Sequence, residues 1–301
     1  MISYQGLINK LDERGIKRSE LTRLLGISSR TIAKIGRGEK LSGAVQKKLC
    51  GFFSCAADEL FREISDNHIL QTLRDEKNAK ISGGLYHELQ VRMTYNSNHI
   101  ENSRLTEEQT RMIFETNTIG SGDGIRVNDI LETVHHFRAI DYIIDSAEEP
   151  LDEKFIKKLH YILLNDSIDA SPGLSAAGEY KKLPNVVGGR ETTKPKDVPA
   201  QMKALLDDYN SKSAVTIYDV IAFHAEFEKI HPFRDGNGRT GRLIALKECL
   251  RFGIVPFLIE DRKKAFYYRG LSKWDAEKGW LTDTCLDGQD TFRRLLATFG
   301  L

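Results

Sequence analysis

Residues 231–242, HPFRDGNGRTGR, bring several groups suited to phosphate chemistry into one short stretch. His231 is the residue of this stretch whose ordinary pKa lies near neutrality, so it is the candidate base for taking a proton from a hydroxyl. Asp235 can bind Mg²⁺, which needs few protein carboxylates when phosphates supply further oxygens. Together these residues predict attack by a hydroxyl on a magnesium-bound nucleotide phosphate.

The glycines and arginines of the same stretch predict how the phosphates would be held. Gly236, Asn237 and Gly238 open a helix, where backbone N–H groups without bulky side chains can surround phosphate oxygens. Arg239 and Arg242 lie three residues apart, which puts both near the same end and face of that helix. Two guanidinium groups in this position suit a triphosphate such as ATP.

The segments on either side must position these groups, and both have helical patterns. Residues 216–230 predict one helix and residues 243–252 another, with Pro232 marking the break between them. Phe233 is expected to be a core anchor that holds the loop. His224 falls on the apolar face of the first helix, so we expect a buried, hydrogen-bonded imidazole.

The rest of the body, residues 65–301, is predicted to be mainly α-helical. Apolar residues recur at helical spacing in 131–147 and 151–166, and further helical pieces follow toward the loop. The exception is the stretch 180–199, where short apolar and threonine-rich pieces surround Gly188-Gly189. This pattern predicts a β-hairpin, which needs other elements to pack on.

The stretch 231–242 resembles the motif of the Fic family, His-Pro-Phe-x-(Asp/Glu)-Gly-Asn-Gly-Arg-x-x-Arg, at every fixed position. The resemblance extends over roughly residues 88–275. It implies a Fic enzyme that transfers AMP from ATP to a Ser, Thr or Tyr hydroxyl of a protein and releases pyrophosphate. The roles it implies are base for His231, Mg²⁺ ligand for Asp235, α- and β-phosphate binding for Asn237 and the amides of Gly236 and Gly238, and outer-phosphate binding for Arg239 and Arg242.

The family resemblance also gives the hairpin and two tyrosines an expected role. Residues 178–194 match the position of a flap over the active site, on which a target protein pairs as an added strand. Tyr267 and Tyr268 resemble an aromatic pair near the adenine. The alternative for both tyrosines is a place in the core.

An inhibitory segment is expected on a helix at about residues 88–102. Ser97 and Glu101 lie four residues apart on one helical face, and SNHIEN resembles the family's inhibitory motif (Ser/Thr)-x-x-x-Glu-(Gly/Asn). Because a guanidinium fork binds a carboxylate or a phosphate equally well, Glu101 paired with Arg242 would exclude a productive ATP. The alternative is an exposed Ser and Glu pair on a solvated helix.

The N-terminal part is basic and predicts a separate small domain. Residues 1–62 carry 12 Lys and Arg against 6 Asp and Glu, whereas the whole chain has a net charge of +1. Residues 17–39 predict two short helices around a glycine turn, with Ser19 capping the first. Residues 4–62 resemble the lambda-repressor and Cro-like helix-turn-helix domain, which implies DNA binding, and a dimer on a two-fold site; the alternative is protein docking. The expected DNA contacts are Ser29, Arg30, Thr31 and Lys34.

These patterns predict a DNA-binding domain at residues 1–64, all α, and a Fic domain at residues 65–301. Four cysteines without framework spacing, no secretory signal and no spanning segment favour a cytoplasmic protein that does not enter membranes. Two other functions remain open. Glu101 would also serve removal of AMP from a modified protein, and the chain would also suit a transcription regulator that senses nucleotide.

Overall fold

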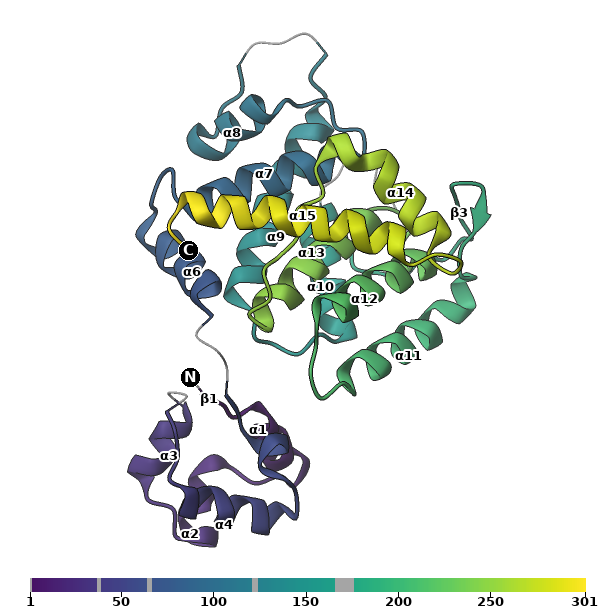
Figure 1. Ribbon diagram of the computed structural model, residues 1–301. Helices are drawn as coiled ribbons and strands as arrows, with labels where there is room; N and C mark the ends of the chain where they lie inside the picture. The colour runs from purple at the N-terminus through teal and green to yellow at the C-terminus, as the bar shows by residue number, and fades with distance from the viewer. Residues whose placement is uncertain (1, 37–38, 64–66, 121–123, 166–175) are drawn as a thin grey trace. The chain divides into compact units, whose positions relative to one another are not determined.

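Helices make up most of the chain (Figure 1), which is known from a computed structural model. The structure describes residues 2–36, 39–63, 67–120, 124–165 and 176–301. The chain divides into two compact units, Met1–Asn67 and His68–Leu301. Each unit has a hydrophobic core of its own.

Five α-helices and one short strand pair make up most of the described part of the smaller unit. The strands β1 (Ile2–Ser3) and β2 (Arg62–Glu63) pair antiparallel, an addition to the all-helical domain that the sequence predicts. All five helices contribute apolar side chains to one buried cluster. The side chain from α3 is Ile35, which is 4% exposed. The helices are α1 (Gln5–Glu13), α2 (Leu21–Leu25), α3 (Ser29–Gly36), α4 (Gly43–Phe53) and α5 (Ala57–Leu60).

The turn between α2 and α3 depends on Gly26, which has φ 63° and ψ 30°. This left-handed conformation suits glycine because it has no Cβ. Ser28 directly precedes α3, and its Oγ accepts a hydrogen bond from the N–H of Thr31 at 3.2 Å. The predicted cap at Ser19 is wrong, because Ser19 lies inside a 3₁₀ turn that precedes α2. Leu24 of α2 is 39% exposed.

Ten helices and one hairpin make up the described part of the larger unit. The predicted helix before the loop, 216–230, is confirmed as α12 (Ile217–Ile230), and the helix after it is α13 (Asn237–Arg251). The others are α6 (His68–Ala79), α7 (Leu85–Ile100), α8 (Glu107–Thr116), α9 (Val127–Asp145), α10 (Glu153–Leu164), α11 (Val198–Asn210), α14 (Lys264–Lys273) and α15 (Gly279–Thr298).

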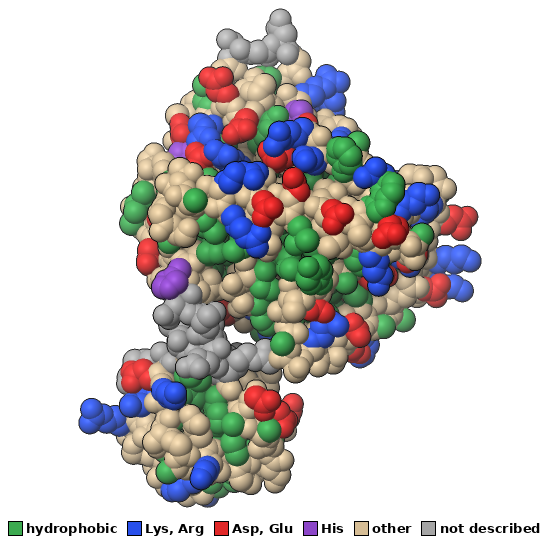
Figure 2. Space-filling view, viewed as in Figure 1, with side chains coloured by type: hydrophobic (Ala, Val, Ile, Leu, Met, Phe, Trp, Pro, Cys, Tyr) green, Lys and Arg blue, Asp and Glu red, His purple; other side chains and the backbone are tan. Residues whose placement is uncertain are grey.

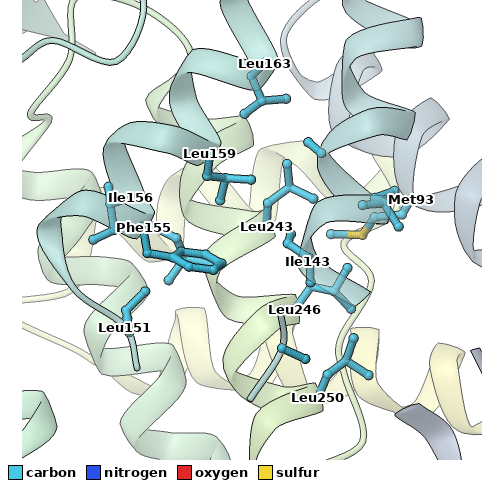
Figure 3. Close-up of a cluster of buried hydrophobic side chains, with 14 of the residues drawn as sticks. Met93, Ile143, Leu151, Phe155, Ile156, Leu159, Leu163, Leu243, Leu246 and Leu250 are labelled. Atoms are coloured by element: carbon cyan, nitrogen blue, oxygen red, sulfur yellow. The ribbon is translucent and has the colours of Figure 1, made fainter. Parts of the chain in front are cut away.

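The helix that follows the loop, α13, runs through the core of this unit. Figure 3 shows its residues Leu243, Leu246 and Leu250 among apolar side chains of α7, α9 and α10. All three leucines are at most 2% exposed. Close packing on several sides fixes the start of α13, where the polar residues of the motif lie.

The hairpin predicted around Gly188-Gly189 is present as β3 (Val186–Val187) paired antiparallel with β4 (Arg190–Glu191). Both glycines have positive φ, 56° and 79°, as a tight turn requires. Val186 and Val187 are 63% and 46% exposed, so the hairpin presents apolar side chains to solvent.

On the face of the larger unit seen in Figure 2, Lys and Arg side chains alternate with Asp and Glu. This face therefore carries no broad patch of one charge. No helix among the described residues is both long and apolar enough to cross a bilayer.

Candidate active site

The corner between α12 and α13 is a tight turn with two left-handed residues. His231 ends α12 with φ 51° and ψ 62°, a conformation that non-glycine residues adopt uncommonly. Gly236 precedes α13 with φ 71°, where a Cβ would lie 2.9 Å from Leu164 Cδ1. Pro232 lies directly after the helix end that it was expected to mark. The corner thereby places His231 beside the first turn of α13.

Two side chains hold this turn from inside. Phe233 is fully buried, as expected of a core anchor. The carboxamide of Asn237 is 1% exposed; its Oδ1 accepts from the N–H of Phe233 and its Nδ2 donates to the carbonyl of Phe233, both at 2.9 Å. These two bonds let Asn237 shape the loop from within. The carboxamide keeps a second N–H and a second lone pair, so phosphate binding by Asn237 stays a prediction.

His160 of α10 is a further member of the site, and the sequence analysis missed it. Its ring stacks on Phe233, with centroids 3.7 Å apart. Nδ1 accepts from the N–H of Gly178 at 2.8 Å, and Nε2 pairs with the carbonyl of Asp235 at 3.0 Å. Burial lowers the pKa of His160 to about 4, although the Asp235 carbonyl opposes the shift. A neutral ring protonated on Nε2 makes both bonds, so His160 ties the loop to the start of the hairpin segment.

The imidazole of His231 is neutral at physiological pH. Burial lowers its pKa to about 4, and the charge of Lys181 adds to this effect. The Glu228 carbonyl and the carboxylates of Glu101 and Asp235 act in the opposite direction. Nδ1 is buried and has no hydrogen-bond partner among the described residues. A neutral imidazole can accept a proton, as a general base must.

Arg242 is held by the segment that was expected to inhibit. Its guanidinium is 2% exposed and donates from Nη2 to Glu101 Oε1 at 2.8 Å. Nε donates to Ser97 Oγ at 3.0 Å, and Nη2 also donates to the Ser97 carbonyl at 2.9 Å. A Cβ built on Gly238 would lie 2.3 Å from Glu101 Oε1. The carboxylate of Glu101 therefore lies against the first turn of α13, where phosphate was expected.

Arg239 points to a different partner from Arg242. It is 3% exposed, and its Nη1 lies 2.9 Å from Glu132 Oε2 of α9. Burial raises the pKa of Glu132, and the nearby Arg239 opposes the shift. Arg239 and Arg242 were both expected to bind one triphosphate. In the structure each forms an ion pair with a different carboxylate, Glu132 and Glu101.

The two tyrosines expected near adenine have different environments. Tyr267 is fully buried, and its hydroxyl pairs with His224 Nε2 at 2.8 Å and accepts from Arg242 at 3.4 Å. Tyr268 is 41% exposed, and its hydroxyl donates to the carbonyl of Ile100 at 3.0 Å. His224 is buried and hydrogen-bonded as expected, and burial lowers its pKa to about 3. Tyr268 alone of the two presents a face to a ligand.

Asp235, the expected Mg²⁺ ligand, is exposed in the turn between α12 and α13. Its side chain is 73% exposed and lies 3.8 Å from Arg239. No cluster of three metal-ligating side chains occurs among the described residues. One exposed carboxylate fits Mg²⁺ only in the mode in which the nucleotide and water supply the other oxygens.

In the smaller unit, α3 presents the residues that were expected to contact DNA. Ser29 and Arg30 are exposed, whereas Thr31 and Lys34 are partly buried. The Lys34 ammonium lies 3.9 Å from Glu39, too far for a strong pair.

The larger unit has a helical core, a hairpin, and a turn with the motif residues directly before the buried helix α13. These features are those of a Fic fold. A family model described as Fic/DOC family matches residues 150–249, and one described as Cro/C1-type HTH DNA-binding domain matches residues 7–66. The chain therefore contains a Fic domain together with a Cro/C1-type helix-turn-helix domain.

Known proteins similar to this chain include Protein adenylyltransferase Fic of Drosophila willistoni, which is 32% identical over 182 residues. That match covers 59% of this chain and 35% of the relative, so the chain spans about a third of that relative's length. A solved Fic domain containing signaling protein from Bacteroides thetaiotaomicron is 26% identical with a TM-score of 0.62, covering 77% of this chain and 91% of its own. Fic-1 from C. elegans, which is 20% identical with a TM-score of 0.62 and covers 78% of this chain and 73% of its own, agrees in fold.

Proposed function

We propose that the chain is an autoinhibited protein adenylyltransferase that carries a DNA-binding domain. One observation carries the inhibited state: the Glu101 carboxylate holds Arg242 and lies against Gly238 at the mouth of α13. His231, at the other end of the same corner, is neutral and buried, and the Glu101 carboxylate acts on its charge. The family of the relatives supports AMP transfer from ATP to a protein hydroxyl.

The residues of the corner have separate tasks in this reaction. His231 accepts the proton of the incoming hydroxyl as that oxygen attacks the α-phosphorus, and pyrophosphate leaves. The backbone N–H of Gly238 would donate to phosphate oxygens at the helix start, where the macrodipole also favours negative charge. The N–H of Gly236, which donates to Asp235 Oδ1 at 2.7 Å in the structure, would join it once the carboxylate turns to Mg²⁺. Arg242, once released by Glu101, holds the outer phosphate. Mg²⁺ held by Asp235 would neutralise charge that develops on the phosphate oxygens.

The hairpin would hold the target protein in place. Its apolar side chains are exposed, and backbone pairing on a sheet edge depends little on sequence. Val186 lies between the hydrogen-bonded pairs Asn185–Thr192 and Val187–Arg190, so its N–H points away from the partner strand, and Val186→Pro removes this N–H from the edge. We expect it to lower transfer to a protein target about tenfold and to leave ATP binding unchanged. Equal transfer by Val186→Pro and the parent would rule out this docking mode.

The experiment that tests the reaction uses the Glu101→Gly variant. It is incubated with Mg²⁺ and ATP and analysed by mass spectrometry beside the parent and Glu108→Gly, a matched change on an exposed part of α8. We expect Glu101→Gly to gain the mass of AMP on a hydroxyl residue, and the other two to gain at least about tenfold less, because Arg242 is free only in the first. No AMP on any protein hydroxyl, in a variant that binds ATP, would contradict the proposal.

Removal of AMP is a second candidate, favoured by the place of Glu101. Its carboxylate acts electrostatically on both Arg242 and His231, so it lies where an attacking water would need a base. Incubation of a pre-adenylylated protein with the parent and with Glu101→Gly separates the two directions. Loss of AMP with the parent alone favours removal, whereas retention with both favours transfer.

A further inference from the structure

Lys181 is a buried lysine at the base of the hairpin to which the reaction gives no role. The residue is 2% exposed. Its ammonium donates to Asn185 Oδ1 at 2.8 Å and to Thr192 Oγ1 at 2.6 Å. Asn185 directly precedes β3 and Thr192 directly follows β4, and their side chains also bond each other. Lys181 therefore joins the two strands where they leave the body of the domain.

The same lysine also holds the backbone on both sides of His231. Its N–H donates to the carbonyl of Pro232 at 2.9 Å. Its ammonium reaches the carbonyl of Ile230 at 3.4 Å. His231, between these two carbonyls, has the left-handed conformation that persists only where its surroundings impose it. One residue thus links the hairpin with the corner that aims the imidazole.

We propose that Lys181 is a positioning residue that couples the hairpin to His231, so that a target held by the hairpin meets an imidazole set in place by the same side chain. The inference rests on the proposed transfer reaction. A target docked on the hairpin must place its hydroxyl within hydrogen-bond reach of His231, and an error of about 1 Å can cost about 100-fold in rate. A shared anchor removes that error.

The ammonium also adds a positive charge beside the imidazole. Burial lowers the pKa of Lys181 to about 8, so it is still largely charged at pH 7. The groups that act on the His231 ring are Lys181 from the hairpin segment, the Glu228 carbonyl of α12, Glu101 after α7, and Asp235 of the loop. Lys181 is the cation among them, and it favours the neutral imidazole. Its removal leaves only groups that favour protonation.

The first test measures the pKa of His231 by NMR in the full chain, with its signal assigned by loss in His231→Asn. We expect Lys181→Met to raise this pKa by about half a unit or more, because a nearby positive charge is lost. Lys181→Arg keeps the charge and the parent value. Lys229→Met removes an exposed lysine two residues from His231 and is the matched control. An unchanged pKa in Lys181→Met overturns the electrostatic part of the proposal.

The second test measures transfer in the Glu101→Gly background. We expect Lys181→Met to lower kcat about tenfold and to leave the KM for ATP within about twofold. The apparent pKa below which kcat falls should move to higher pH. Thr192→Ala removes the hydrogen bond between Lys181 and the hairpin and keeps the bonds of Lys181 to Ile230 and Pro232. It therefore tests the coupling even if Lys181→Met does not fold. It should lower kcat for a protein target, whereas Thr298→Ala on α15 should not. An unchanged kcat in Thr192→Ala overturns the coupling.

A double-mutant cycle and the titration separate this proposal from the proposed function. If Lys181 and Thr192 act through one link, the combined variant loses little more activity than either single variant. Additive losses contradict the link. If the Glu101→Gly protein transfers no AMP at all, the proposed function fails, and the His231 titration still decides whether Lys181 acts on the imidazole.

Discussion

Two helix–turn–helix corners of this chain use opposite means to present polar residues. The corner between α12 and α13 is built from buried side chains, with Phe233 fully buried and Asn237 bonded to the backbone at both ends. At the corner between α2 and α3 the left-handed backbone of Gly26 makes the bend, and Arg30 is left exposed. A catalytic site needs atoms that are fixed before the ligand binds. A DNA-binding surface needs side chains that can adapt to the phosphates and bases that they contact.

The sharpest way to test the first corner is His231→Ala. We expect AMP transfer by the Glu101→Gly protein to fall by about 10³-fold or more, since the proton of the attacking hydroxyl has no acceptor. ATP binding and the unfolding temperature should stay close to those of the parent, as measured by calorimetry. Transfer within tenfold of the parent would remove His231 from the reaction.

Phe233→Ala breaks the buried support of the same corner. We expect the free energy of unfolding to fall by about 3–5 kcal/mol, as for other fully buried phenylalanines. Urea unfolding followed by tryptophan fluorescence reports on the larger unit, which contains both tryptophans, Trp274 and Trp280. Phe266→Ala, at a site 47% exposed, is the control and should cost less than about 0.5 kcal/mol. Equal costs would mean that the corner is not held from inside.

Arg30→Ala tests the exposed corner. We expect affinity for DNA fragments selected from a random pool to fall about tenfold, the loss typical of one arginine contact. The stability of the smaller unit should not change, because the side chain is exposed. Lys47→Ala, on the exposed surface of α4, removes the same charge elsewhere and should cost less. Equal losses for the two variants would indicate a charge effect without a recognition helix.

Glu228→Gln gives the smallest effect, a change in pH dependence. Burial raises the pKa of Glu228 to about 8 from its usual 4.5, so the folded protein holds a proton that the unfolded chain has lost. Between about pH 5 and 8 this carboxyl therefore makes the free energy of unfolding decline as pH rises. The lowered pKa values of His160, His224 and His231 act in the opposite direction below about pH 7.5, and those of Lys181 and Lys247 do so near pH 8, so the decline is read as the difference between the parent and Glu228→Gln.

Urea unfolding at several pH values checks this prediction, with Asp283→Asn at an exposed site as control. Glu228→Gln should reduce the decline, since glutamine does not titrate, while the control keeps the slope of the parent. A slope unchanged in Glu228→Gln would mean that the carboxyl is ionised in the folded state.

Local signals in the sequence were enough to find the elements of the site. Pro232 and the apolar spacing of 216–230 predicted the end of α12, Gly188-Gly189 predicted the hairpin, and Phe233 was recognised as a core anchor. Such features depend on backbone preference and on residues within a few positions. His160 escaped notice because its two hydrogen-bond partners are 18 and 75 residues away.

What the sequence by itself determined is the composition of the site. Twelve residues hold an imidazole, a carboxylate, a glycine-rich helix start and three arginines, two of which, Arg239 and Arg242, lie in that helix. The tertiary structure alone decided how they are used, because partners from distant helices compete for each group. Glu132 takes Arg239, Glu101 and Ser97 take Arg242, and the loop backbone takes Asn237. A polar group buried without a partner costs free energy, so most such groups are paired, and the neighbours that folding supplies determine which groups remain for a ligand.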